Sequence, residues 1–117
     1  MDDVWVKHIT QEGLSPIKGI RGRWRRWITP TGENRGMIVA VGRLEPGEAM
    51  GWHAHAEPEV FYVLEGNGQA RWKEGAVEGN AELVPGVAFY KVGGVSHQMV
   101  NTGKTPLVGL AFKVADV

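Results

Sequence analysis

Three histidines and one glutamate have the residue types and the spacing of a metal site. His53 and His55 are separated by one residue, and Glu59 follows four residues after His55. On a β-strand, residues i and i+2 project from the same face, so the two imidazoles can point at one ion. A turn after His55 would return Glu59 on the neighbouring strand, and His97 is the candidate for a fourth ligand. Imidazole with carboxylate suits a borderline divalent ion such as iron, manganese, nickel, zinc or copper.

Taken alone, the two adjacent histidines could be a chance pair on a solvent-facing strand, but the residues around them follow a longer pattern. Its first part runs Gly47, five residues, His53-x-His55, three residues, Glu59, six residues, Gly66. Its second part runs Gly86, five residues, Val92-x-Gly94, two residues, His97, three residues, Asn101. These parts resemble the two sequence motifs of the cupin superfamily at every position except Val92, where the family has proline.

The resemblance implies a single cupin domain over residues 1–117, with motif one at 47–66 and motif two at 86–101. It implies an all-β fold, an antiparallel double-stranded β-helix or jelly-roll barrel, with one divalent transition metal near its mouth. Carried over by position, the metal ligands would be His53, His55, Glu59 and His97, while Asn101 would be structural. Four protein ligands leave two adjacent positions open in an octahedral field. A metal with open positions can act as a Lewis acid or generate hydroxide.

The function implied by this site is that of a metal-dependent enzyme acting on a small organic molecule, of either oxygenase or lyase class. The alternative, from a different class, is a non-catalytic cupin that binds or senses a sugar or an organic acid. The chain is also similar to the dimethylsulfoniopropionate lyases among small cupins. Those enzymes have a base tyrosine two residues after the glutamate ligand, where this chain has Phe61. The resemblance also implies a homodimer, in which residues 4–6 form an edge strand that adds to the partner's sheet.

Short strands are the elements that must position these residues. The 17 glycines in 117 residues are about twice the usual share of ~7%, and they stand singly between β-rich runs. The predicted strands cover residues 24–29, 37–44, 52–55, 59–64, 69–73, 81–84, 87–92, 97–101 and 107–114. This spacing is typical of an all-β sandwich or barrel. The sequence Gly66-Asn67-Gly68, directly after the run at 59–64, predicts a hairpin turn.

Composition excludes several other classes of protein. Lys and Arg total 13 and Asp and Glu total 13, so net charge favours neither nucleic acid nor an anionic membrane as a partner. The absence of cysteine excludes disulfides, thiolate metal sites and cysteine nucleophiles. No apolar run approaches the ~20 residues that span a membrane. We therefore expect a soluble, cytoplasmic protein that acts on a small molecule.

Alternation along the predicted strands selects the apolar residues that would surround the metal. If Glu59 points into the barrel, Phe61 and Val63 point there too, and Met99 shares the inward face of His97. These three residues are the candidate substrate pocket. The alternative reading, that they fill the barrel core, is compatible with that role.

Two polar residues complete the candidate site. Tyr90 is the nearest possible acid or base that is not a metal ligand, although a tyrosine in an apolar strand more often packs. Arg26 could clamp a substrate carboxylate or phosphate at the barrel mouth. The alternative for Arg26 is a solvated strand face, because it belongs to an arginine-rich run at residues 21–26.

Overall fold

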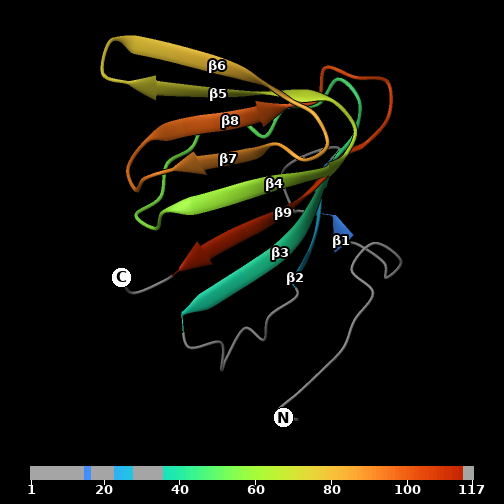
Figure 1. Cartoon of the computed structure of the whole chain (residues 1–117), viewed down its shortest axis with the longest axis horizontal. Helices are drawn as coiled ribbons and strands as arrows, with labels where there is room; N and C mark the ends of the chain where they lie inside the picture. Colours follow the sequence, from blue (N-terminus) through green and yellow to red (C-terminus); the bar gives the residue numbers. More distant parts are fainter. Residues whose placement is uncertain (1–14, 17–22, 28–35, 115–117) are drawn as a thin grey trace.

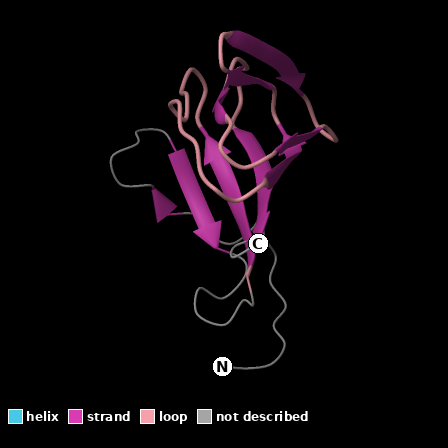
Figure 2. Ribbon diagram, turned by 90° about the vertical axis from the view of Figure 1, so that its left-hand side faces the viewer, coloured by secondary structure: helices cyan, strands magenta, loops and turns pink. Residues whose placement is uncertain are grey.

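The computed structural model describes residues 15–16, 23–27 and 36–114, and all regular structure in these ranges is β-strand (Figures 1 and 2). The strands are β1 (Ser15–Pro16), β2 (Arg23–Trp27), β3 (Met37–Leu44), β4 (Glu59–Glu65), β5 (Gly68–Glu74), β6 (Val77–Leu83), β7 (Ala88–Lys91), β8 (Ser96–Val100) and β9 (Leu107–Val114). The described residues therefore include no helix that is long and apolar enough to cross a membrane.

The strands form two antiparallel sheets. The larger sheet has the order β1-β2-β3-β9-β4-β7, and the smaller has the order β6-β5-β8. Figure 1 shows the small sheet above the large one, with neighbours in space that are often far apart in the chain, such as β3 and β9. This arrangement confirms the predicted all-β, antiparallel jelly-roll class.

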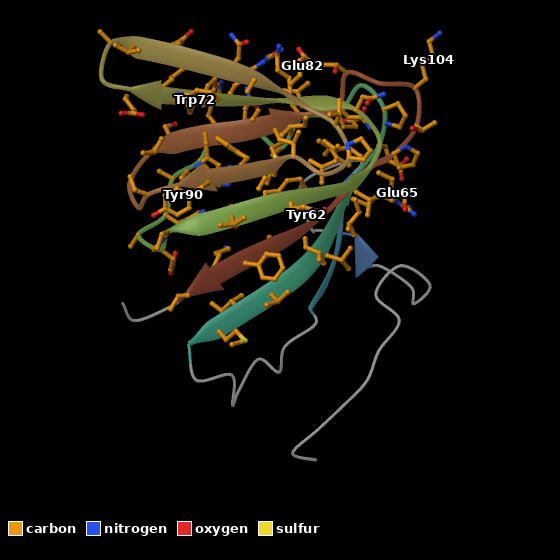
Figure 3. All side chains as sticks on the ribbon, in the orientation of Figure 1. Tyr62, Glu65, Trp72, Glu82, Tyr90 and Lys104 are labelled. Atoms are coloured by element: carbon orange, nitrogen blue, oxygen red, sulfur yellow. The ribbon has the colours of Figure 1, made fainter. Side chains whose placement is uncertain are left out.

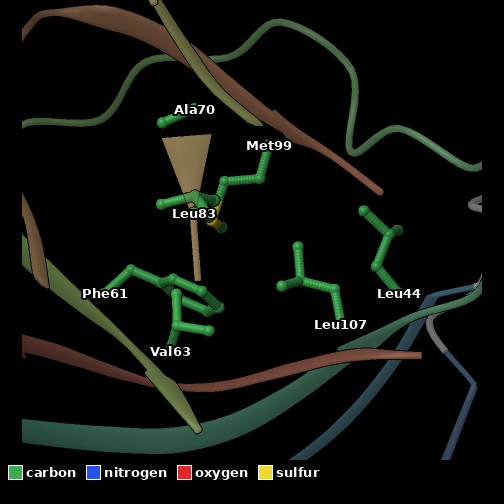
Figure 4. Packing of buried hydrophobic residues seen from close by; sticks show 7 residues of the cluster. All are labelled: Leu44, Phe61, Val63, Ala70, Leu83, Met99 and Leu107. Carbon is green, nitrogen blue, oxygen red and sulfur yellow. The ribbon is translucent and has the colours of Figure 1, made fainter. Parts of the chain in front are cut away.

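The core lies between the two sheets and draws on both (Figure 4). Its seven buried apolar side chains are Leu44, Phe61, Val63 and Leu107 from the large sheet, and Ala70, Leu83 and Met99 from the small one. On β4, burial alternates as predicted, with Glu59, Phe61 and Val63 buried and Tyr62 exposed. Because β4 alternates so regularly, Glu59 enters the barrel on the same face as the core.

The link between β4 and β5 corrects one expectation. Gly66-Asn67-Gly68 was expected to close a hairpin, but β4 pairs with β7 and β9, whereas β5 pairs with β6 and β8. The chain instead passes from the large sheet to the small one at this point. A tight hairpin joins β5 to β6, where Glu74 pairs with Val77. Turn chemistry specifies a change of direction, but it does not identify the strand with which the next segment pairs.

Three further differences separate the observed strands from the predicted ones: one boundary, one additional strand and one strand that does not form. β6 begins at residue 77 rather than 81, because residues 77–80, which are mostly exposed, gain their backbone partners by pairing with β5. β1 was not predicted. Residues 52–55 form no strand, and only His53 makes an isolated bridge. Residues 28–29 of one predicted strand, and the predicted edge strand at residues 4–6, lie outside the described residues.

Candidate metal centre

Backbone pairing brings His53 and His97 together although 43 residues separate them in the sequence. The His53 N–H donates to the carbonyl of His97 at 3.0 Å, and the His97 N–H donates to the carbonyl of His53 at 2.9 Å. The ring centroids of these two residues lie 4.3 Å apart, and the His55 ring lies 5.1 Å from that of His97. One ring nitrogen from each of the three histidines lies within 4.8 Å of the others. The two motifs therefore deliver three imidazoles to one place.

The turn between β7 and β8 is hydrogen-bonded to motif one and so sets the position of His97 relative to His53 and His55. Gly94 has a φ of +86°, and its N–H donates to the carbonyl of His55 at 2.8 Å. A Cβ on Gly93 would collide with the carbonyl group of Ala56. The two segments can therefore approach each other this closely only because residue 93 is glycine. Val92 replaces the family's proline just before this turn, and the turn forms without it.

All three imidazoles are held in the same tautomer. Each ring nitrogen Nδ1 lies 2.8–2.9 Å from a backbone carbonyl two residues away, in the pairs His53–Gly51, His55–Glu57 and His97–Val95. A carbonyl oxygen only accepts, so each Nδ1 must carry a proton, and in the neutral ring the lone pair is then on Nε2. The Nε2 atoms of His55 and His97 are buried and have no hydrogen-bond partner within residues 15–16, 23–27 and 36–114. Such outer hydrogen bonds are what orient histidines that ligate metals.

Glu59 lies beside two of these histidines but is held by lysines. Its Oε1 atom is 3.8 Å from Nε2 of His55 and 3.9 Å from Nε2 of His97. The same atom is 2.6 Å from Nζ of Lys91, and Oε2 is 3.8 Å from Nζ of Lys113. Burial would raise the pKa of the Glu59 carboxyl, but the charges of Lys91 and Lys113 outweigh this and lower the pKa below its usual value. Glu59 is therefore a carboxylate, the form that can ligate a metal.

His97 is the most deeply buried of the imidazoles, with 1% of its surface exposed. Burial lowers its pKa from 6.5 to about 4, and the neighbouring Lys91 charge acts in the same direction. The hydrogen bond from Nδ1 to Val95 and the charge of Glu59 oppose this shift only in part. At neutral pH the ring is uncharged, which is the state that binds a metal.

The structure places Lys91, not Tyr90, at the site. On β7 the side chains of Phe89 and Lys91 face inward, whereas Tyr90 is 60% exposed on the outer side of the sheet (Figure 3). Tyr90 is thus turned away from the site for which it was considered. Lys91 pairs with Glu59 across β4 and β7, and only 2% of its side chain is exposed. The inward position of Lys91 could have been inferred from the sequence. Side chains alternate along a strand, so if Phe89 faces inward, Lys91 must face inward too.

A small apolar cavity of about 60 Å³ lies inside the barrel next to Glu59. Phe61 and Met99 line it, as predicted for the pocket, but Val63 does not. Val63 is fully buried in the core instead, one strand period beyond Phe61 and further from the site. Arg26 lies on β2 beside Val41, and its side chain is outside the described residues.

A larger cavity of about 450 Å³ lies between β5 and β7 and includes Lys91 in its wall. Its other lining residues include Trp72 and Phe89, whose ring centroids lie 5.6 Å apart. The Phe89 ring lies 6.5 Å from that of His97. The aromatic wall of this cavity therefore extends to the histidine cluster.

Comparison with known families identifies the motifs. The family model described as Cupin domain matches residues 40–113, which is more than half of the chain. A comparison with curated protein sequences finds no match.

Several solved structures share the fold. The polyketide cyclase RemF from Streptomyces resistomycificus superposes with a TM-score of 0.81 at 18% identity, covering 97% of this chain and 80% of that protein. A predicted oxalate decarboxylase from Thermotoga maritima gives 0.76 at 25% identity, covering 94% and 98%. A cupin 2 conserved barrel domain protein from Salinispora arenicola gives 0.77 at 16% identity, covering 98% and 92%.

Proposed function

Because the chain belongs to the cupin family, we propose that it is a metal-dependent enzyme that binds one divalent transition metal and acts on a small organic molecule. The proposed ligands are His53, His55, His97 and Glu59. One observation carries the proposal. One ring nitrogen from each of the three histidines lies within 4.8 Å of the others, and each ring is oriented by a backbone carbonyl at Nδ1.

When bound, the metal would supply a Lewis acid or a bound hydroxide for the reaction. The chain supplies the surroundings. Glu59 adds a negative charge to the neutral imidazoles, and Phe61 and Met99 present an apolar surface that excludes water from the small cavity beside it. Lys91 is a titratable group beside Glu59 that is not itself a proposed ligand. Its presence favours an enzyme over a passive binding module, because metal and lysine together offer both polarisation and proton transfer.

The structural neighbours support an enzyme without identifying the reaction. One is a polyketide cyclase and another is a predicted oxalate decarboxylase. For this chain we keep oxygenase and lyase as the two candidate classes, with iron, manganese, nickel, zinc and copper as candidate ions. The homodimer and the cytoplasmic location remain predictions from the sequence.

Elemental analysis of the purified protein, followed by oxygen uptake with small organic acids and sugars, tests the proposal. We expect close to one equivalent of metal in the wild type and loss of most of it in His53→Ala. His8→Ala is the matched control, because it removes an imidazole that belongs to neither motif, and it should keep the metal. Full metal occupancy in His53→Ala would overturn the ligand assignment. Iron with oxygen consumption would favour the oxygenase class, and zinc or nickel without it would favour the lyase class.

The second candidate is a non-catalytic module that binds or senses a sugar or an organic acid. The observation in its favour is Phe61, which has no proton-accepting group where the related lyases have their base. A metal-loaded protein that binds such a molecule tightly but leaves it unchanged would select this candidate.

A further inference from the structure

Lys91 is a buried ammonium group that has too few partners. Its Nζ atom has no hydrogen-bond partner of good geometry among the described residues. It is paired with Oε1 of Glu59, 2.6 Å away, and otherwise contacts the face of the Phe89 ring, 4.6 Å from its centroid. An ammonium group carries three donors, so at least two of them lack an acceptor there. Burying a charged donor without acceptors costs free energy, and such a group in a folded protein needs a reason.

The position of Lys91 indicates what its unused donors could bind. The Glu59 oxygen that Lys91 contacts is also the one that faces Nε2 of His55 at 3.8 Å and Nε2 of His97 at 3.9 Å. Lys91 also forms part of the wall of the 450 Å³ cavity between β5 and β7. A small molecule that occupies this cavity and reaches the histidines would therefore meet the ammonium group at the same point.

The charges around the site select the kind of molecule. Two ammonium groups, Lys91 and Lys113, approach the single carboxylate of Glu59. A second carboxylate, Glu57, is partly exposed and lies 3.4 Å from Nδ1 of His55, on the side of the ring away from Nε2. A third, Glu74, also lines the 450 Å³ cavity, but it is exposed to solvent at the end of β5. Addition of a divalent ion would therefore leave excess positive charge in a buried place. Such charge is costly unless an anion balances it.

We propose that Lys91 is a specificity-determining residue that donates to a negatively charged oxygen of the substrate, so that the site takes a small organic anion such as a carboxylate. The inference rests on the proposed metal function and names the substrate class for it. The unfilled donors of Lys91 and the excess positive charge both point to an anion. The hydroxyl groups of a neutral sugar could accept from these donors, but they would leave the excess charge unbalanced.

The competing explanation is that Lys91 only positions Glu59. The two explanations predict different effects of Lys91→Met on the metal. If Lys91 positions Glu59, its removal weakens metal binding. If Lys91 serves the substrate, its removal leaves metal binding unchanged or tighter, because a repelling charge is lost, and weakens binding of the anion instead.

The experiment uses the full chain loaded with cobalt(II), whose visible absorption reports changes in coordination. Oxalate, oxamate and oxamide are titrated as a series of similar shape that carries two, one and no negative charges. We expect the wild type to bind oxalate most tightly and oxamide most weakly. In Lys91→Met, oxalate should bind ten- to a hundredfold more weakly, the usual effect of losing a charged hydrogen bond, while cobalt affinity without the anion does not fall.

Two further variants serve as controls. Lys91→Arg keeps the charge and should retain most of the oxalate affinity. Lys113→Met removes the more exposed ammonium at 3.8 Å from Glu59 and should change oxalate affinity less than threefold. Equal oxalate binding by Lys91→Met and wild type, or a tenfold loss of cobalt affinity in Lys91→Met, would overturn the inference alone. Failure of the wild type to take up cobalt would overturn the proposed function itself.

Discussion

His97 lies near the start of β8 and Asn101 directly follows its end, and each has 1% of its surface exposed. The Asn101 side chain is fully partnered. Its Nδ2 donates to the carbonyls of Leu44 at 2.8 Å and Thr105 at 2.9 Å, and its Oδ1 accepts the N–H of Gly103 at 2.8 Å. The Nδ1 atom of His97 likewise donates to a backbone carbonyl, but its Nε2 atom has no hydrogen-bond partner in the part of the chain that the structure describes.

The difference separates a residue that holds the fold from one that is available to a ligand. A buried polar group whose partners all belong to the chain stabilises one conformation. A buried polar group that keeps a lone pair unpartnered requires something from outside the chain. Motif two thus carries one residue of each kind within five positions, and the substitutions below test that distinction.

The largest effect is expected for His97→Ala. Removing one of four ligands should weaken metal binding roughly a thousandfold, since each ligand carries a large share of the binding free energy. Isothermal titration with zinc measures the effect. The Asn101→Ala protein, titrated at a temperature where it is folded, should bind zinc like the wild type. Equal weakening of zinc binding in both variants would contradict the distinction between a ligand at His97 and a structural residue at Asn101.

Asn101→Ala should instead lower the free energy of unfolding by about 3–4 kcal/mol. The substitution removes the side-chain partner of the buried Leu44 carbonyl and of the part-buried Thr105 carbonyl and Gly103 N–H. An unsatisfied buried group costs roughly 1–3 kcal/mol, and the two part-buried groups add less. Urea unfolding of the metal-free protein gives the value. A loss below about 1 kcal/mol would mean that Asn101 does not hold the fold.

Acid should destabilise the metal-free protein through His97. Its pKa is lowered to about 4 in the folded state from 6.5, so between these values the unfolded chain binds the extra proton. Stability is therefore lost as the pH falls from 6.5 to 4, by no more than about 3 kcal/mol from this residue. Urea midpoints measured across this range with a chelator present report the loss. The variant His97→Asn, which cannot titrate there, should show a shallower dependence, and an unchanged slope would contradict the assignment.

The smallest effect is expected for Phe61→Tyr, which adds a polar atom to the wall of the small cavity. The new hydroxyl should cost about 1 kcal/mol of stability if it finds no partner. It also introduces a tyrosine where the lyases that the sequence resembles have their base, two residues after the glutamate, so we expect weak lyase activity toward dimethylsulfoniopropionate. Release of dimethyl sulfide by the metal-loaded variant is the measurement. A folded, loaded variant without activity would leave the likeness to those lyases unsupported.

The positions that were predicted correctly are those that depend on neighbouring residues in the sequence, through strand alternation or motif spacing. Alternation placed Glu59, Phe61 and Val63 on the buried face of β4. Motif spacing selected His53, His55 and His97, although residues 52–55 form no strand and the histidines meet through an isolated bridge instead. The three-histidine cluster was therefore predictable in its residues but not in the backbone that assembles it.

The remaining features depend on contacts between distant segments. The inward face of β7 could not be deduced from His97, because the turn at residues 92–95 breaks the alternation between β7 and β8. For that reason Tyr90 was selected and Lys91 was missed. The ion pair of Lys91 with Glu59 arises from pairing between strands more than 20 residues apart in the chain, and no local rule specifies that register.

The reciprocal pair of backbone hydrogen bonds between His53 and His97 has a consequence for how an ion is acquired. Since the main chain already holds the imidazoles in place, capture of an ion requires little further ordering of the protein. Uptake and release can then proceed without refolding. The cellular supply of each ion, together with its ligand preference, would decide which one occupies the barrel.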